Sequence, residues 1–216
     1  MKRRDFSLAA TAAGLAPWLA ATSAHAQQAS FKAGSDYLVL QRPAPVEAPA
    51  GKVEVVEFFS YNCPHCAEFE PMLEAWAQKL PAHAVLRRVP VPFVGNDVQT
   101  KQRLYYALEA MGKVDAYQGK LFQLIHRDRM PLTGDAAVLD WAAKQPDLGD
   151  KFAENFKSFS VASKVKRASQ LTDEYKVGGV PALGVAGRWY VDGETGRGLP
   201  RALQVVDFLI GEARKG

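Results

Sequence analysis

The chain contains very little cysteine. Only two of its 216 residues are cysteines, Cys63 and Cys66, and only four are histidines. A structural zinc site needs four ligands, but the chain offers no second cysteine pair and only the scattered His25, His83 and His126. We therefore expect no metal and no cofactor, and we assign His83 and His126 no role.

Outside its N-terminal segment, the chain also lacks an excess of positive charge. The formal net charge is +4, and Lys2, Arg3 and Arg4 set against Asp5 supply two of those charges. Without that segment the chain is close to neutral, so a surface for binding polyanions is not indicated. We expect no nucleic-acid partner.

The apolar stretch at the N-terminus is too short to make a good membrane span. Residues 1–26, MKRRDFSLAATAAGLAPWLAATSAHA, combine a basic start, an Ala-rich apolar stretch and small residues at Ala24 and Ala26. This pattern predicts a secretory signal peptide cut after Ala26, with an uncleaved membrane anchor as the alternative. The RRDFSL run also resembles a twin-arginine export signal, which leaves the export route open. An export signal predicts that the mature chain resides in a bacterial periplasm, where disulfides persist.

Both cysteines lie in one short stretch, FFSYNCPHCAEFEP, residues 58–71. Covalent haem attachment needs a histidine directly after the second cysteine, and Ala67 at that position excludes it. A structural staple explains the spacing poorly, because the stabilisation from a disulfide grows with the size of the loop that it closes. A redox dithiol explains the spacing better, since two close sulfurs can exchange with another protein and resolve the mixed disulfide within the loop.

The flanks of this stretch predict a strand followed by a helix. VEVVEFFS, residues 53–60, is rich in β-branched and aromatic residues, as a buried parallel strand should be. After the cysteines, apolar residues recur at helical spacing, namely Phe69, Leu73, Trp76 and Leu80. Pro64 suits the first helical position, which places Cys63 at or before the N-cap.

A cysteine at a helix N-terminus is predicted to be acidic. Free backbone N–H groups and the positive end of the helix dipole face the Cys63 sulfur, and a protonated or hydrogen-bonding His65 adds to this effect. We therefore predict that Cys63 is the exposed nucleophile with a low pKa and that Cys66 is the more buried resolving thiol. Pro71 lies inside the helical pattern and is expected to kink the helix without ending it.

A second candidate element lies far along the chain, in YKVGGVPALGVAGRWYV, residues 175–191. There, Gly178, Gly179, Val180 and Pro181 stand in front of a short apolar strand. Such a corner is a good place for a cis peptide bond before the proline. The alternative is a loop that merely introduces the strand.

With these residues identified, the chain resembles the DsbA-type thiol:disulfide oxidoreductases of the thioredoxin superfamily. EFFSYNCPHC is similar to the family's first strand and Cys-Pro-His-Cys site, and GGVPALGV is similar to its Val–cis-Pro loop. The resemblance implies an α/β class, a thioredoxin-like fold with an inserted helical domain. The small Gly184 departs from the family pattern and weakens any inference about the shape of the substrate groove.

The resemblance also implies roles for residues around the cysteines. Val180 and Pro181 are expected to lie beside Cys63 and to pair with the backbone of an extended client. Glu57 is expected to be a buried acid beneath Cys66. Its position in an otherwise apolar strand predicts a raised pKa and a role in relaying the proton of that thiol, with a solvent-facing edge residue as the alternative.

The pattern along the chain predicts five segments. These are the signal peptide (1–26), an extended lead-in (27–45), a thioredoxin-like first half with the Cys-Pro-His-Cys site (46–96), a helical insertion (97–167) and a second half with the cis-Pro loop (168–216). AVLRRVPVPF, residues 84–93, is predicted to be the second strand, and LPRALQVVDFLIGEA, residues 199–213, a final amphipathic helix. Within the insertion, Phe152, Phe156 and Phe159 recur at helical spacing and are predicted to lie in the core.

The function predicted from these features is a periplasmic oxidase that donates the Cys63–Cys66 disulfide to exported proteins through a mixed disulfide. A disulfide isomerase or reductase of the same superfamily is one alternative, although the span between Gln27 and the first strand is short for the isomerases' dimerisation domain. A redox-inactive, chaperone-like binding module is another. The resemblance implies reduced exported proteins as clients and a quinone-linked membrane oxidase of the DsbB type as a partner. We expect a monomer.

Overall fold

The computed structural model of the chain describes residues 30–215, and the signal peptide predicted over residues 1–26 lies outside them. The strands are β1 (Leu38–Val39), β2 (Val53–Phe59), β3 (Ala84–Pro90), β4 (Ala182–Val185) and β5 (Trp189–Asp192). The helices are α1 (Pro64–Ala77), α2 (Val98–Ala110), α3 (Val114–Phe122), the π-helix η1 (Gln123–Arg127), α4 (Gly134–Ala143), α5 (Gly149–Phe156), α6 (Phe159–Glu174) and α7 (Leu199–Ala213).

Strand β2 is central in the sheet. The strand order is β1-β5-β4-β2-β3, with β2 parallel to β3 and antiparallel to β4. Every residue of β2 is buried, as its largely apolar sequence predicted for a strand covered on both faces. Strand β3 ends earlier than the predicted limit at residue 93, because Pro90 and Pro92 have no N–H to extend the ladder.

The N-terminal part of the described chain adds a strand to the sheet, and its C-terminal helix packs against the sheet. Within the lead-in, β1 adds an edge strand that pairs antiparallel with β5, so this segment is more ordered than the extended stretch that we predicted. The final helix α7 has the bounds that the sequence predicted, residues 199–213. Its buried apolar side chains face the sheet.

From Val53 to Phe58, the side chains of β2 alternate between the two faces of the sheet, as the two-residue period of a strand requires. Val53 and Val55 belong to a cluster with residues of α1 and α7. Val56 and Phe58 belong to the other cluster, which includes residues of α2 and α6. Glu57 shares the parity of Val53 and Val55, so its side chain is directed to the face that α1 covers.

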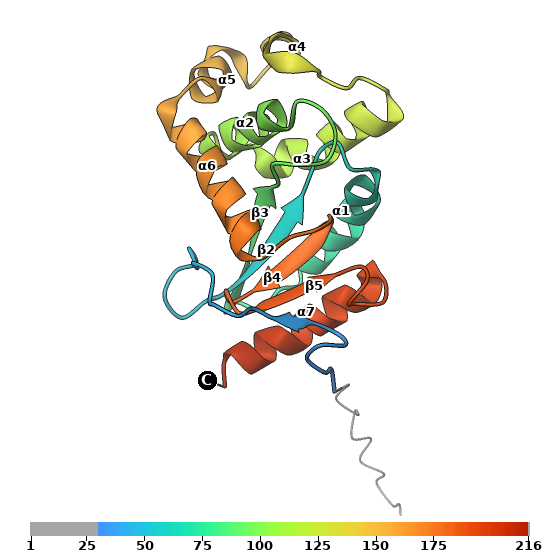
Figure 1. Cartoon of the computed structure of the whole chain (residues 1–216). Helices are drawn as coiled ribbons and strands as arrows, with labels where there is room; N and C mark the ends of the chain where they lie inside the picture. The colour runs from blue at the N-terminus through green and yellow to red at the C-terminus, as the bar shows by residue number, and fades with distance from the viewer. Residues whose placement is uncertain (1–29, 216) are drawn as a thin grey trace, which may run out of the picture. The chain divides into compact units, whose positions relative to one another are not determined.

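The helical segment lies between β3 and β4, and Figure 1 shows α2–α5 gathered at one end of the sheet with α6 leading back toward it. Helix α6 continues to Glu174, past residue 167, where we placed the end of the insertion. Phe152 and Phe156 are buried, but Phe159 is 87% exposed, so the prediction of a core position was wrong for Phe159. Phe159 is the first residue of α6, and the chain turns between α5 and α6, which interrupts the helical period on which the prediction relied.

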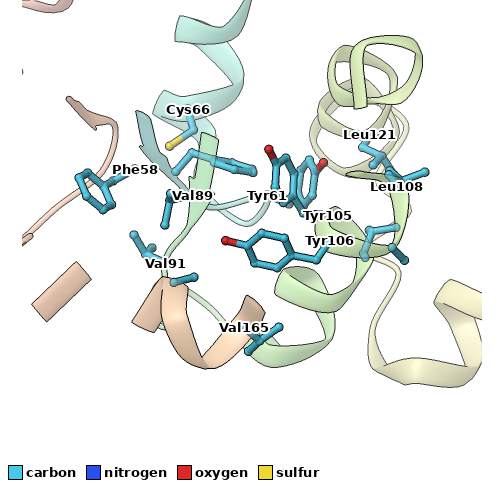
Figure 2. Close-up of a cluster of buried hydrophobic side chains, with 14 of the residues drawn as sticks. Phe58, Tyr61, Cys66, Val89, Val91, Tyr105, Tyr106, Leu108, Leu121 and Val165 are labelled. Carbon is cyan, nitrogen blue, oxygen red and sulfur yellow. The ribbon is translucent and has the colours of Figure 1, made fainter. Parts of the chain in front are cut away.

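One continuous core joins the helical insertion to the sheet. Figure 2 shows Cys66 and Tyr61 in the same buried cluster as Leu108 of α2 and Leu121 of α3. The chain from Phe31 onward accordingly forms one compact unit. Among the described residues, no helix is both long and apolar enough to cross a membrane.

The structure also explains why Gly184 is small. The ring of Tyr175 packs directly on Gly184, and a Cβ there would lie 2.3 Å from Tyr175 Cε1. Tyr175 cannot easily yield, because its hydroxyl accepts a hydrogen bond from the Gly187 N–H at 3.1 Å and its ring packs against Phe58. The absent side chain at residue 184 therefore makes room for this tyrosine inside the protein.

We predict that Gly184→Ala lowers the free energy of unfolding by about 1–3 kcal/mol, because the core has no room for the added methyl group. Gly119→Ala is the matched control, since a Cβ at this helical position in α3 meets nothing within 4 Å and should stabilise the protein by up to about 1 kcal/mol. Urea unfolding of the three proteins measures both changes. Equal stability of Gly184→Ala and the parent protein would contradict the packing argument.

Candidate active site

The two cysteines lie at the start of α1, directly after the central strand β2. Cys63 is the N-cap residue and Pro64 the first residue of the helix, as the sequence predicted. No side chain caps this helix end, so backbone N–H groups of its first turn are available to the Cys63 sulfur. The helix continues through Pro71 as far as Ala77.

Both cysteines are free thiols, and both are buried. Cys66 is fully buried, as predicted, but Cys63 is only 5% exposed, so the prediction of an exposed nucleophile was wrong in degree. The cause is the distant loop before β4. The Cys63 thiol donates a hydrogen bond to the carbonyl oxygen of Val180 at 3.4 Å, and the Val180–Pro181 peptide bond is cis. The predicted proximity of Val180 to Cys63 is thus confirmed.

The two thiols have opposite acidities. The pKa of Cys63 is lowered from 9.0 to about 6, first by the hydrogen bond from the Cys66 thiol and further by the backbone N–H groups of Cys66 and His65, while burial opposes the shift. The pKa of Cys66 is raised, because its proton is held in the hydrogen bond to Cys63 and because burial disfavours a second thiolate. The pair therefore favours a thiolate at Cys63 and a thiol at Cys66.

His65 contributes less than its position in the motif suggested. Its charge lowers the Cys63 pKa, but it is the smallest of the causes, after the hydrogen bonds from Cys66 and from the backbone. The side chain is 74% exposed, and its Nδ1 lies 3.2 Å from Glu68 Oε2. A solvated imidazole that faces a carboxylate acts only weakly on a neighbouring sulfur.

Glu57 is fully buried, which confirms the predicted burial and rules out the solvent-facing alternative. Burial and the nearby charge of Glu70 raise its pKa to about 8, and Arg88 opposes this rise. The Arg88 Nε atom lies 3.2 Å from Glu57 Oε2, an ion pair by distance in which the N–H is not aligned as a hydrogen bond. The charge of Glu57 also raises the pKa of Cys66, so the acid and the buried thiol are electrostatically linked.

Several residues at this site were missed in the sequence. Arg88 stands opposite Glu57 in the β2–β3 register, and its Nη2 donates a hydrogen bond to Glu70 Oε1 of α1 at 2.7 Å. The two-residue alternation of β3 could have indicated Arg88, because a residue paired with Glu57 in a parallel register faces the same side of the sheet. His126, to which we assigned no role, lies with its Nε2 at 2.9 Å from the carbonyl oxygen of Tyr61 in the loop before Cys63.

Two adjacent thiols that differ this much in acidity can pass a disulfide to another protein and receive it back. The fold and the site therefore define a thiol:disulfide oxidoreductase. A family model described as a DSBA-like thioredoxin domain matches residues 54–204. The chain belongs to this DsbA family, which also confirms the thioredoxin-like fold with its helical insertion.

Individual relatives agree with this assignment. The chain is 39% identical over 192 residues to the thiol:disulfide interchange protein DsbA of Burkholderia cepacia, covering 89% of this chain and 90% of the relative. It is 41% identical over 198 residues to the DsbA of Bordetella parapertussis, covering 91% and 93%. The crystal structure of Pseudomonas aeruginosa DsbA matches with a TM-score of 0.79 at 34% identity, covering 86% of this chain and 95% of that one.

We predict that Cys66→Ala raises the pKa of Cys63 by about one unit or more, because it removes the interaction that lowers this pKa the most. Cys66→Ser keeps a hydroxyl donor at the same place and should raise the pKa less. His65→Ala should also have a smaller effect than Cys66→Ala. The ultraviolet absorbance of the thiolate, followed against pH, measures all three. A larger shift in His65→Ala than in Cys66→Ala would contradict the ranking.

Proposed function

We propose that this protein is a periplasmic oxidase that donates a Cys63–Cys66 disulfide to reduced exported proteins. The observation that carries the proposal is the opposed acidity of the two thiols, with Cys63 favoured as thiolate and Cys66 as thiol. An ionised Cys63 is a good leaving group and stabilises the reduced form of the pair. A pair whose reduced form is favoured gives its disulfide away readily, and DsbA proteins are the standard example of this behaviour.

The reaction proceeds in two exchanges. A client thiolate attacks Cys63 Sγ, the bond between Cys63 and Cys66 breaks, and Cys66 leaves with the electron pair and takes up a proton. A second client thiolate then attacks the client sulfur of the mixed disulfide, and Cys63 leaves as a thiolate. The client loses two electrons and gains a disulfide, while the protein ends as the dithiol.

Two further elements serve these exchanges. Glu57 is proposed to relay the proton that Cys66 gains or loses, since it is buried, carries a raised pKa and acts electrostatically on that thiol. Val180 and Pro181 are proposed to hold the backbone of an extended client. This role is supported by a cavity of about 250 Å³ that His65, Val180 and Pro181 line and by the contact of the Val180 carbonyl with Cys63 Sγ.

The cycle also needs an oxidant that restores the disulfide. We propose a quinone-linked membrane oxidase of the DsbB type for this step, as membership of the family implies. It would accept the two electrons from the Cys63 and Cys66 dithiol by the reverse exchange. We propose that the protein acts as a monomer.

We predict that Cys66→Ser accumulates a mixed disulfide with a peptide whose cysteine is activated as a disulfide to a good leaving thiol, because the Cys63 thiolate displaces that thiol and no resolving thiol is present. Cys63→Ser should accumulate essentially none, since the buried Cys66 is not reachable and is poorly ionised. Non-reducing gel electrophoresis after incubation with an activated cysteine peptide measures the yields. Similar yields from the two variants would show that the roles of the cysteines are wrongly assigned.

We predict that the reduced protein melts at least about 2 °C above the oxidised protein at pH 7–8, since about 1 kcal/mol corresponds to roughly 2–4 °C in a chain of this size. The pKa of Cys63 is lowered from 9.0 to about 6 on folding, so its contribution to the stability of the reduced form grows between pH 6 and pH 9 and is lost as the pH falls through 6. Calorimetry of both forms between pH 4 and 9 measures the gap. A higher melting temperature of the oxidised form throughout this range would favour an inert disulfide staple.

A further inference from the structure

Two buried carboxyl groups, Glu57 of β2 and Glu70 of α1, share the guanidinium of Arg88. Arg88 lies between them, with Nε at 3.2 Å from Glu57 Oε2 and Nη2 at 2.7 Å from Glu70 Oε1. Both acids are almost completely buried. If both were ionised, the site would carry an uncompensated negative charge in the protein interior, which is strongly unfavourable. The pair is therefore expected to hold one proton at neutral pH, and the question is which acid holds it.

The hydrogen-bond donors around the two acids are unequal. Neither carboxyl oxygen of Glu57 receives an aligned hydrogen bond. Glu70 accepts one from Arg88 Nη2 and a second, at 3.4 Å, from Nε2 of Gln118. Glu70 also borders a cavity of about 320 Å³ that Glu57 does not line. Because donors and water favour the ionised form of an acid, Glu70 is the better site for the negative charge and Glu57 for the proton.

The amide of Gln118 can donate to Glu70 because its orientation is fixed from the other side. The hydroxyl of Tyr61 donates a hydrogen bond to Gln118 Oε1 at 2.6 Å, so the NH₂ group of the amide is turned toward Glu70. Tyr61 remains a donor across the physiological range, since burial raises its pKa well above 10.0. Both side chains are buried, and Gln118 lines the same cavity as Glu70.

We propose that Gln118 is a positioning residue that, oriented by Tyr61, keeps Glu70 ionised at neutral pH and thereby leaves the single proton of the acid pair on Glu57. This inference rests on the proposed relay role of Glu57. It assigns a part in the proton transfer to α3, so the helical insertion acts on the chemistry of the dithiol through one amide. The contact between Gln118 and Glu70 could not be predicted from the sequence, because the two residues lie on different helices.

The variants used in the test below leave the other titratable groups that face these acids in place. They are Arg88 of β3, Glu74 of α1, Asp115 of α3 at the cavity, and the thiol of Cys66. In the oxidised protein the two thiols are absent as titrating groups, which leaves the carboxyl groups to be followed alone. The experiment is therefore done on the oxidised full-length protein.

The test is a ¹³C NMR titration of the Glu57 and Glu70 carboxyl carbons in wild type and in Gln118→Met, which removes the amide at similar volume. In wild type, Glu70 should titrate below Glu57. In Gln118→Met, the Glu70 midpoint should rise by about one pH unit, so that the two midpoints approach each other. Tyr61→Phe should move the Glu70 midpoint in the same direction by a smaller amount, because the amide remains but is no longer oriented.

Gln102→Met is the matched control. Gln102 is an equally buried glutamine of the helical insertion, and its Nε2 donates to the carbonyl oxygen of Pro90 at 2.9 Å rather than to an acid. A purely structural effect of losing a buried amide would appear in this variant too, whereas the proposal predicts an unchanged Glu70 midpoint. Should Gln118→Met fail to fold, Tyr61→Phe carries the test by itself.

Three results would overturn the proposal. These are a wild-type Glu70 midpoint at or above that of Glu57, an unmoved Glu70 midpoint in both Gln118→Met and Tyr61→Phe, or an equal rise in Gln102→Met. Oxidation of a reduced dithiol peptide by the wild-type protein separates this failure from a failure of the proposed function. The peptide is still oxidised if only the role of Gln118 is wrong, and it stays reduced if the oxidase assignment is wrong.

Discussion

The placement of Cys63 at the N-cap of α1, with Cys66 buried in the first turn of the same helix, is the constraint on which the chemistry of this protein depends. It requires two sulfurs within the first turn of α1, one at the N-cap, where backbone N–H groups favour negative charge, and one buried below it, where a second charge is disfavoured. The strand β2 and Pro64 fix where that helix begins. A shift of the helix start by one residue would move Cys63 away from the N–H groups and reduce the difference between the thiols.

Burying an acid in the central strand has a structural cost that the sheet register offsets. Glu57 lies in the central strand, and its ionised form could not remain there without a cation. The parallel register of β2 and β3 sets Arg88 opposite Glu57, and the guanidinium then reaches Glu70 on the covering helix. Strand, neighbouring strand and helix thus each supply one titratable group to a single buried cluster. Losing Arg88 or Glu70 would leave a buried charge unbalanced.

The helical insertion belongs to the same physical unit as the dithiol. Tyr61, two residues before Cys63, is held at both ends by the insertion: its hydroxyl donates to Gln118 of α3, and its carbonyl oxygen lies at hydrogen-bond distance from His126 of η1. Its ring also packs with Phe59 and Phe122. The insertion therefore holds the loop that carries the nucleophile through both packing and hydrogen bonds.

The sequence by itself determined the features that depend on neighbours along the chain. Local spacing, capping residues and the apolar period are enough to predict strand β2, the start of α1 at Pro64, the N-cap position of Cys63 and the final helix α7. Only the tertiary structure decided how far Cys63 is exposed, because Val180, which covers it, is 117 positions away. It also decided that Phe159 is exposed, that Arg88 joins Glu57 to Glu70, and that Gln118 contacts Glu70. Burial and hydrogen-bond partners arise from contacts between distant segments, and no pattern of neighbouring residues contains that information.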